Sequence, residues 1–484
     1  MRTTRRRCAI FLLMFFSVVC NAQHTKTAEQ RTADYLESIR NQPGLLAAFA
    51  AQMPKGGDLH NHLSGAVYAE SYIQFAADDG LCVDRPTLSF TQPPCDESKG
   101  QLSASRALQD GVLYRELIDA MSMRDFKPAA QSGHDHFFDT FGRFRIPARV
   151  HTAEMIAEVA SRAARQNESY LELTLSPDRG AAGPVGAKVG WDDDFAAMRE
   201  KLLAGGLREV ITSAIKNIDE IDAESKRLMC ASTAKMAGSP PQRSKIGIAG
   251  DPGCGLQVRY IYELYRGFPK EQVFAQALAG FELATADPRI VSVNPVMPED
   301  GYVSMHDYEL HMRIFDFLHK LYPKVHLTMH AGELAPGLVP PDGLSFHIRQ
   351  AVELGHAERI GHGVDLMHED RPFDLLKEMA EKKVAVEICF TSNDVILGIR
   401  GREHPFPQYL NYKVPVVIAT DDEGVSRSDM SREYQRAIET YGLNWGQLKQ
   451  IVRNSIQYSF VDDQTKAELL KDLEQRFAKF EIQF

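Results

Sequence analysis

Histidine and aspartate residues follow short apolar runs at several points along this 484-residue chain. His60 and His62 lie two residues apart, a spacing that turns both imidazoles to the same face of a strand. His330 follows another apolar run, and Asp421 and Asp422 follow the last one. Neutral imidazoles, a carboxylate and an open position for water constitute a catalytic transition-metal site, and zinc is the ion that such ligands favour. We therefore expect one metal centre.

The elements that must position these residues form a repeating pattern. Short apolar runs alternate with helix-period segments, which predicts a parallel sheet with helices between its strands. The expected strands are 58–63, 169–175, 257–264, 290–296, 325–330, 359–364, 384–389 and 414–419. The expected helices between them are 152–166, 270–286, 307–321, 345–354 and 372–382.

Eight such units in one α/β domain fit a (β/α)₈ TIM-type barrel better than an open sheet. Active sites of these barrels lie at the carboxyl ends of the strands, which is where the histidines and aspartates are expected. An N-terminal helical segment and inserted loops complete the predicted architecture. We assign residues 1–22 to a signal peptide, 23–52 to an N-terminal helical extension and 53–484 to the barrel, with insertions at about 78–105 and 213–255.

The N-terminus has the features of a secretory signal peptide. Several arginines precede an apolar stretch at 9–19, and small residues precede a cleavage site after Ala22. The apolar stretch is shorter than the roughly 20 residues that a membrane-spanning helix needs. We expect an exported, periplasmic or secreted protein without stable membrane insertion.

The net charge excludes one class of partner, and the cysteines suggest disulfide bonds. The net charge of −10 argues against nucleic-acid binding, which requires a basic surface. In an oxidising compartment Cys82 with Cys95 is the best candidate disulfide, and Cys230 with Cys254 is a second candidate. Cys389 lies in an apolar run and is expected to be a buried thiol.

Five motifs, in order along the chain, give it a family resemblance. They are the paired histidines of D-L-H-N-H at 58–62, H-A-G-E at 330–333, G-H-G at 361–363, Ser392-Asn393, and T-D-D at 420–422. From Met53 to Ser426 the chain resembles the adenosine deaminase family of metal-dependent hydrolases, and more narrowly its secreted, growth-factor-like branch.

The resemblance implies a ligand set and a reaction. One Zn²⁺ per chain would be held by the four residues His60, His62, His330 and Asp421. The implied reaction is hydrolytic deamination of adenosine or 2′-deoxyadenosine by a zinc-activated water, which gives inosine or 2′-deoxyinosine and ammonia.

The resemblance also implies catalytic roles. Glu333 would be the general acid, His362 would orient the water as base or electrostatic partner, and Asp422 would face the purine and hold the water. Alternatives remain open at each position. Glu333 could orient an imidazole, His362 could be a fourth imidazole ligand, and Asp422 could be structural.

Two positions depart from the family pattern. Ser64 stands where many members have an aspartate that reaches the ribose, and Met297 stands where a glycine is usual. Both are expected to contact substrate, as is Asp422. The strand at 290–296 contains no lysine, which a two-metal relative would use as a bridging ligand, so one metal is favoured.

These departures leave two alternatives to adenosine deamination. The same barrel could deaminate another aminopurine or a modified nucleoside, or it could be a secreted signalling or binding protein of this fold. The expected partner is a small purine nucleoside, with no nucleic acid, and a homodimer is one option for the assembly.

Overall fold

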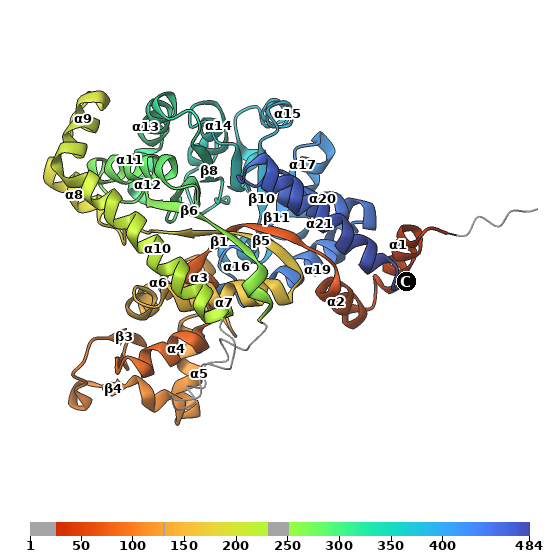
Figure 1. The fold of residues 1–484 in the computed structure, drawn as a ribbon, viewed down its shortest axis with the longest axis horizontal. Helices are drawn as coiled ribbons and strands as arrows, with labels where there is room; N and C mark the ends of the chain where they lie inside the picture. The colour runs from red at the N-terminus through yellow and green to blue at the C-terminus, as the bar shows by residue number, and fades with distance from the viewer. Residues whose placement is uncertain (1–25, 129–130, 231–250) are drawn as a thin grey trace, which may run out of the picture.

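The computed structural model describes residues 26–128, 131–230 and 251–484 (Figure 1). The predicted signal peptide at 1–22 lies outside these ranges, as does the middle of the predicted insertion at 213–255. Within the described ranges, no helix combines the length and the apolar character needed to cross a membrane.

Eight parallel strands form the central sheet, in the order in which they occur along the chain. They are β1 (Gly56–His62), β5 (Glu168–Leu175), β6 (Gln257–Tyr265), β7 (Ile290–Val296), β8 (His326–Ala331), β9 (Arg359–His362), β10 (Ala385–Ile388) and β11 (Val416–Ile418). A parallel bridge between Asn61 and Asp421 joins the last strand's carboxyl end to the first. The predicted barrel is confirmed.

The barrel strands are buried because helices cover them on the outside, as parallel sheets require. The helices α7 (Thr152–Arg165), α11 (Lys270–Ala286), α13 (Tyr308–Leu321), α14 (His347–Glu353) and α15 (Pro372–Lys382) agree with the five predicted segments to within two residues at each end. The remaining helices around the barrel are α8 (Ala182–Val189), α9 (Phe195–Leu202), α10 (Arg208–Cys230), α12 (Tyr302–His306), α16 (Phe390–Leu397), α17 (Phe406–Tyr412) and α18 (Glu423–Ser426).

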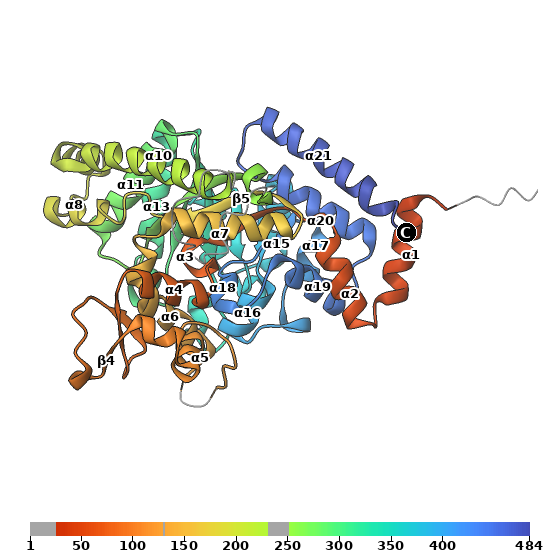
Figure 2. The ribbon, with the colours of Figure 1, turned by 60° about the horizontal axis from the view of Figure 1, so that its bottom comes forward.

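The first and the last helices of the described ranges pack together on one side of the barrel (Figures 1 and 2). The helices there are α1 (Ala28–Ile39), α2 (Pro43–Gln52), α19 (Met430–Tyr441), α20 (Trp445–Gln457) and α21 (Asp463–Glu481). Trp445 is buried between them, with its ring centroid 5.6 Å from that of Phe49 and 5.5 Å from that of Phe480. The N-terminal helical segment is thus anchored on the C-terminal helices.

An insertion after the first strand forms a small unit of its own, below the barrel in Figure 1. The strands β2 (Cys82–Asp84), β3 (Ser89–Thr91) and β4 (Gln101–Ser103) make an antiparallel sheet. The helices α3 (Leu63–Ala66), α4 (Ala69–Asp78), α5 (Gly111–Ala120) and α6 (Gly133–Ala148) connect it to the barrel.

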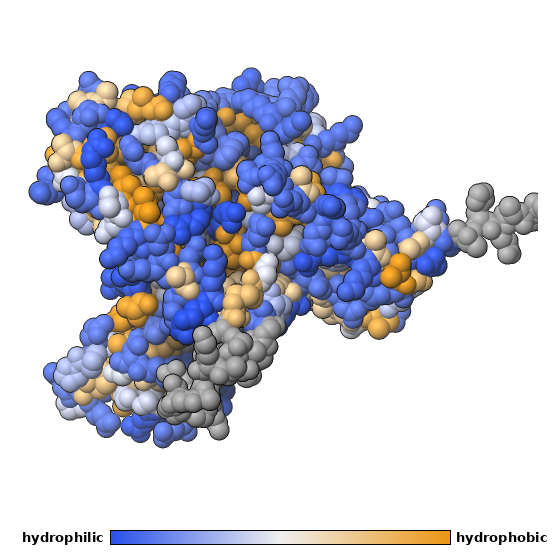
Figure 3. Space-filling model, viewed as in Figure 1, coloured by the Kyte–Doolittle hydropathy of each residue, from blue (hydrophilic) through white to orange (hydrophobic). Residues whose placement is uncertain are grey.

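Both predicted disulfides are present. Cys82 of β2 is bonded to Cys95, which lies between β3 and β4, and Cys230 at the end of α10 is bonded to Cys254. Cys389 is a buried thiol, as predicted. The outer surface seen in Figure 3 is mostly hydrophilic, with hydrophobic residues in separate patches.

Candidate active site

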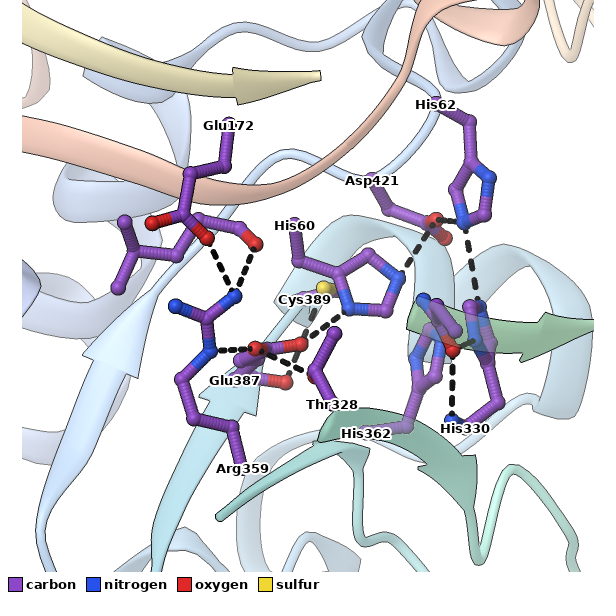
Figure 4. A network of polar contacts seen from close by, with 12 residues as sticks. His60, His62, Glu172, Thr328, His330, Arg359, His362, Glu387, Cys389 and Asp421 are labelled. Carbon is purple, nitrogen blue, oxygen red and sulfur yellow. Dashed lines mark hydrogen bonds and ion pairs between the residues drawn. The ribbon is translucent and has the colours of Figure 1, made fainter. Parts of the chain in front are cut away.

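Four candidate metal ligands meet at the carboxyl ends of the barrel strands (Figure 4). His60 and His62 are on β1, His330 is on β8, and Asp421 follows β11. Their ligand atoms all lie within 4.8 Å of one another. The Nε2 atoms of His62 and His330 are 3.2 Å apart, and Asp421 Oδ1 is 3.4 Å from Nε2 of both His60 and His62.

The hydrogen-bond partners of these imidazoles leave lone pairs directed at the same point. His60 Nδ1 lies 2.6 Å from a carboxylate oxygen of Glu387, and His330 Nδ1 lies 3.0 Å from the amide oxygen of Asn294. Both oxygens can only accept, so Nδ1 carries the hydrogen and Nε2 does not. Within the described part of the chain, buried His60 Nε2 has no hydrogen-bond partner. The donor set therefore fits a divalent cation such as zinc.

A buried ion-pair network fixes the orientation of His60. Glu387 accepts hydrogen bonds from His60, from Thr328 Oγ1 at 2.9 Å and from Arg359 Nε at 2.5 Å. Arg359 also binds Glu172 at 2.6 Å. Burial opposes ionisation of Glu387, but Arg359 and His60 overcome it and lower the pKa of this carboxyl to about 2. Glu387 is thus a charged acceptor that holds the ligand imidazole in place.

Replacing Glu387 with Gln is expected to lower metal affinity by about 10- to 100-fold, because the charge that orients His60 is lost. Competition for zinc with a chromogenic chelator measures this. The matched control is Glu172→Gln, which also removes a carboxylate from Arg359 but does not touch His60. Equal zinc affinity in the two variants would contradict the role of Glu387.

Glu333 lies beside the candidate ligands, after the end of β8. Its carboxyl group is buried, and this burial, together with nearby Asp421 and Glu299, raises its pKa although His362 acts in the opposite direction. Glu299 fixes the turn, since its two oxygens accept from the Gly332 N–H at 3.1 Å and the Glu333 N–H at 2.7 Å. A raised pKa favours the protonated carboxyl, and a protonated carboxyl can act as a general acid.

His362 ends β9 and faces the same space. Its Nδ1 lies 2.9 Å from the Asn393 amide oxygen, so Nδ1 carries the hydrogen. Its Nε2 is 3.6 Å from Glu333 Oε1. The backbone φ is +67° at His362 and +61° at Asp421, a region that is uncommon for residues other than glycine and that often marks functional positions.

Asp422 approaches the backbone of α3 so closely that only glycine fits there. A Cβ on Gly65 would lie 1.6 Å from Asp422 Oδ1. Burial and the adjacent Asp421 raise the pKa of Asp422 well above its usual range. This carboxyl is therefore held at a fixed place in the site, where burial favours its neutral form.

Replacing Gly65 with Ala is expected to displace Asp422 and reduce kcat/KM by roughly 100-fold, as misplacements of about 1 Å do. Rates of the reaction that the sequence motifs imply, with circular dichroism as a check on folding, measure this. Gly44→Ala is the matched control, because a Cβ at Gly44 would meet no atom within 4 Å. A Gly65→Ala variant as active as this control would show that the position of Asp422 is unimportant.

A cavity of about 830 Å³ opens above these residues. Ser64, Met297 and Asp422, the three residues expected to contact substrate, all line it. Met297 has φ +92°, which matches a position where glycine is usual. Four phenylalanines of α6 form one wall, and of these Phe137 and Phe144 are also buried in the core.

No motif in the sequence predicted the residues that orient the candidate ligands. Glu387 and Glu172 are single carboxylates inside apolar strand runs, and Asn294 is a single amide in another. A polar side chain in a buried strand needs a hydrogen-bonding partner. A single polar residue inside an apolar run is therefore the sequence signal that could have identified these residues. Glu263 was also missed; it lines the cavity with Oε2 4.0 Å from His62 Nδ1.

Part of this chain is similar in sequence to known proteins. Residues 247–476 match the family model described as adenosine deaminase. An adenosine deaminase of Clostridium acetobutylicum is 30% identical over 167 residues, which are 34% of this chain and 46% of that protein. An adenine deaminase of Rhizobium leguminosarum bv. trifolii is 29% identical over 221 residues, which are 45% of this chain and 62% of that protein. The matches thus span about half the length of these relatives.

Solved structures share the fold over nearly their whole length. The Arabidopsis protein ADAL in complex with IMP superposes with a TM-score of 0.56 and 18% identity, covering 89% of this chain and 99% of that one. An amidohydrolase of Burkholderia ambifaria with bound zinc has a TM-score of 0.53 and 16% identity, covering 90% of this chain and 93% of that one. At these identities the comparison shows a common barrel fold.

Proposed function

We propose that this chain is an exported zinc enzyme of the adenosine deaminase family that deaminates adenosine or 2′-deoxyadenosine, and the match of residues 247–476 to the adenosine deaminase family model supports this. The observation that carries the proposal is the meeting of three imidazoles and Asp421 beside Glu333, a buried carboxyl whose pKa is raised, at a cavity that His62, His330, Glu333 and Asp421 line. The fit of the donor set and the zinc in a solved barrel of the same fold support zinc as the metal.

The reaction replaces an amino group by oxygen. The C6–N bond of the purine breaks, a C6–O bond forms with a water oxygen, and the amino group leaves as ammonia after gaining one proton, while the second proton of the water is balanced by the proton that N1 gains. Zinc held by His60, His62, His330 and Asp421 would lower the pKa of water bound to it toward about 7. Side chains of the protein transfer the protons and orient the purine.

Two side chains are placed to move the protons. Burial favours the protonated form of Glu333. Glu333 donates this proton to ring nitrogen N1 as attack of water at C6 moves electron density onto N1. His362, with its hydrogen on Nδ1 toward Asn393, offers the Nε2 lone pair to the proton of the attacking water. Protonated Asp422 donates to the ring nitrogen N7 and fixes the plane of the base.

A substrate panel tests the proposal. The protein is incubated with adenosine, 2′-deoxyadenosine, adenine and N6-methyladenosine, and released ammonia or methylamine is quantified. We expect adenosine and 2′-deoxyadenosine to be the preferred members of this panel. Preference for adenine or for the methylated nucleoside would move the assignment to another aminopurine, and Ser64 and Met297 would be the first residues to exchange. No turnover of any aminopurine would contradict the proposal.

A further inference from the structure

Arg266 and Glu299 are buried charged residues that the proposed reaction does not use directly. Arg266 follows β6, and Glu299 lies between β7 and α12. Neither residue lines the cavity. Removing a charge from water is unfavourable, so each of the two side chains needs partners that compensate for its burial.

The guanidinium group of Arg266 contacts the backbone of two residues of the site. Its Nη1 donates to the carbonyl oxygen of His330 at 3.0 Å, and its Nη2 donates to that of Met297 at 3.3 Å. His330 is a candidate metal ligand on β8, and Met297 lines the cavity after β7. Arg266 therefore joins the ends of these two strands.

The carboxylate of Glu299 binds the turn that follows β8. Successive N–H groups of a turn form a concavity that binds an anion. Here the N–H groups of Gly332 and Glu333 donate to the two oxygens of Glu299, at 3.1 and 2.7 Å. Gly332 has φ +76°, a conformation that favours glycine. The turn leads directly to the Glu333 carboxyl, whose Oε1 lies 3.6 Å from Nε2 of His362.

Glu299 is held in its charged form. Burial opposes ionisation, but His347 and Arg266 overcome it and lower the pKa of the Glu299 carboxyl to about 2. His347 begins α14, and its Nδ1 lies 2.7 Å from Glu299 Oε1. An ionised carboxylate accepts stronger hydrogen bonds from backbone N–H groups than a neutral acceptor does.

These two residues differ from a buried pair whose charges contact each other. Arg162 Nη2 lies 2.6 Å from a carboxylate oxygen of Glu423. Arg266 Nη2, by contrast, lies 3.9 Å from Glu299 Oε2, which is beyond hydrogen-bond distance. Arg266 and Glu299 instead direct their hydrogen bonds at backbone atoms of the site.

We propose that Arg266 and Glu299 are positioning residues that hold the backbone from His330 to Glu333, and so fix the Glu333 carboxyl relative to the metal ligands. They touch neither the purine nor the metal and act through Glu333. The inference rests on the proposed function, in which Glu333 is the general acid. A displacement of about 1 Å at a reacting group can cost about 100-fold in rate, so the turn that carries Glu333 must be rigid.

The variant Glu299→Gln tests the inference, and Glu369→Gln is its matched control. Glu369 is also a buried carboxylate that accepts from two successive backbone N–H groups, but these belong to Ile348, at 2.5 Å, and Arg349, at 3.3 Å, in α14. Glutamine replaces one carboxylate oxygen by an N–H₂ group, so one N–H of the turn loses its acceptor. The measurements are kcat and KM with adenosine, and zinc affinity.

We expect Glu299→Gln to lower kcat about tenfold or more, with KM and zinc affinity within about threefold of the wild type. Glu369→Gln should keep the wild-type kcat. Because Glu299 acts through Glu333, the same exchange in a Glu333→Gln background should change kcat by less than about twofold. If Glu299→Gln does not fold, Glu299→Asp, which keeps the charge but withdraws the oxygens from the turn, takes its place with the same expected effects.

Arg266→Lys tests the other residue. Lysine keeps the positive charge but lacks the planar fork that reaches the carbonyl oxygens of both His330 and Met297. We expect kcat to fall about tenfold or more, again without a further loss in the Glu333→Gln background. A wild-type kcat in Arg266→Lys would remove Arg266 from the inference.

Hydrogen exchange of backbone amides gives a readout that does not depend on turnover. In the intact protein, a peptide that spans 331–335 should exchange several-fold faster in Glu299→Gln than in the wild type or in Glu369→Gln, because the N–H groups of the turn lose their acceptor. Mass spectrometry of that peptide measures the exchange.

The inference is overturned by an unchanged kcat or unchanged exchange in Glu299→Gln, by an equal loss of kcat in Glu369→Gln, or by an undiminished effect in the Glu333→Gln background. Failure of the proposed function has a different signature, because the wild-type protein then deaminates no aminopurine. In that case the role in catalysis falls with the proposed function, and hydrogen exchange still decides whether Glu299 holds the turn.

Discussion

Replacing Glu333 with Gln is expected to reduce kcat by about 1,000-fold or more, within the 10²- to 10⁴-fold range of general acid–base catalysis. Gln has nearly the same shape but cannot give up a proton to ring nitrogen N1. Burial raises the pKa of Glu333 and so favours its protonated form, and the exchange for Gln therefore removes a proton donor more than it removes a charge. Steady-state rates with adenosine measure this, and zinc content should remain at one per chain.

The control for this variant is Glu358→Gln. Glu358 is a half-exposed glutamate at 48% side-chain exposure that pairs with His326 away from the cavity. It should retain wild-type activity. A Glu333→Gln variant that keeps more than about a tenth of the wild-type rate would show that Glu333 orients an imidazole and is not the acid.

Replacing Asp421 with Asn is expected to lower zinc affinity by more than about 100-fold, beyond the 10- to 100-fold effect of residues that merely orient ligands. The amide is a poorer ligand and removes the negative charge that faces His60 and His62 at 3.4 Å. Deamination should be lost with the metal. Zinc content after dialysis and the rate at saturating zinc are the measurements.

Asp365→Asn is the matched control for the loss of a buried aspartate. Burial and the neighbouring Glu299 and Glu369 raise the pKa of Asp365 well above its usual range, which favours the neutral carboxyl that an amide resembles. The Asp365→Asn variant should bind zinc as the wild type does. Retention of full zinc affinity by Asp421→Asn would remove Asp421 from the ligand set.

The fold and the residues that meet at the metal position were predictable because their signals are local. Each strand is a short apolar run, and His60, His62, His330 and Asp421 lie at or just after the ends of such runs. A parallel barrel gathers those ends on one face, so periodicity and motif order were enough. The five predicted helices agree with the structure for the same reason.

Residues that act across the barrel could not be predicted. Glu387 matters because it contacts His60, 327 positions earlier in the chain, and no local pattern encodes that pairing. The left-handed backbone of Met297 depends on the turn after β7, not on methionine. Arg266 and Glu299 contact the residues at the end of β8 only because β6, β7 and β8 are neighbours in the sheet.

The most direct test of a metal-dependent deaminase is the ultraviolet absorbance of adenosine, followed with the zinc-loaded protein, after zinc chelation and after zinc is returned. The account predicts that the adenosine signal decays toward that of inosine, that chelation stops the decay, and that zinc restores it. Decay that continues at the same rate after complete removal of the metal would contradict it, as would an unchanged signal in the zinc-loaded protein.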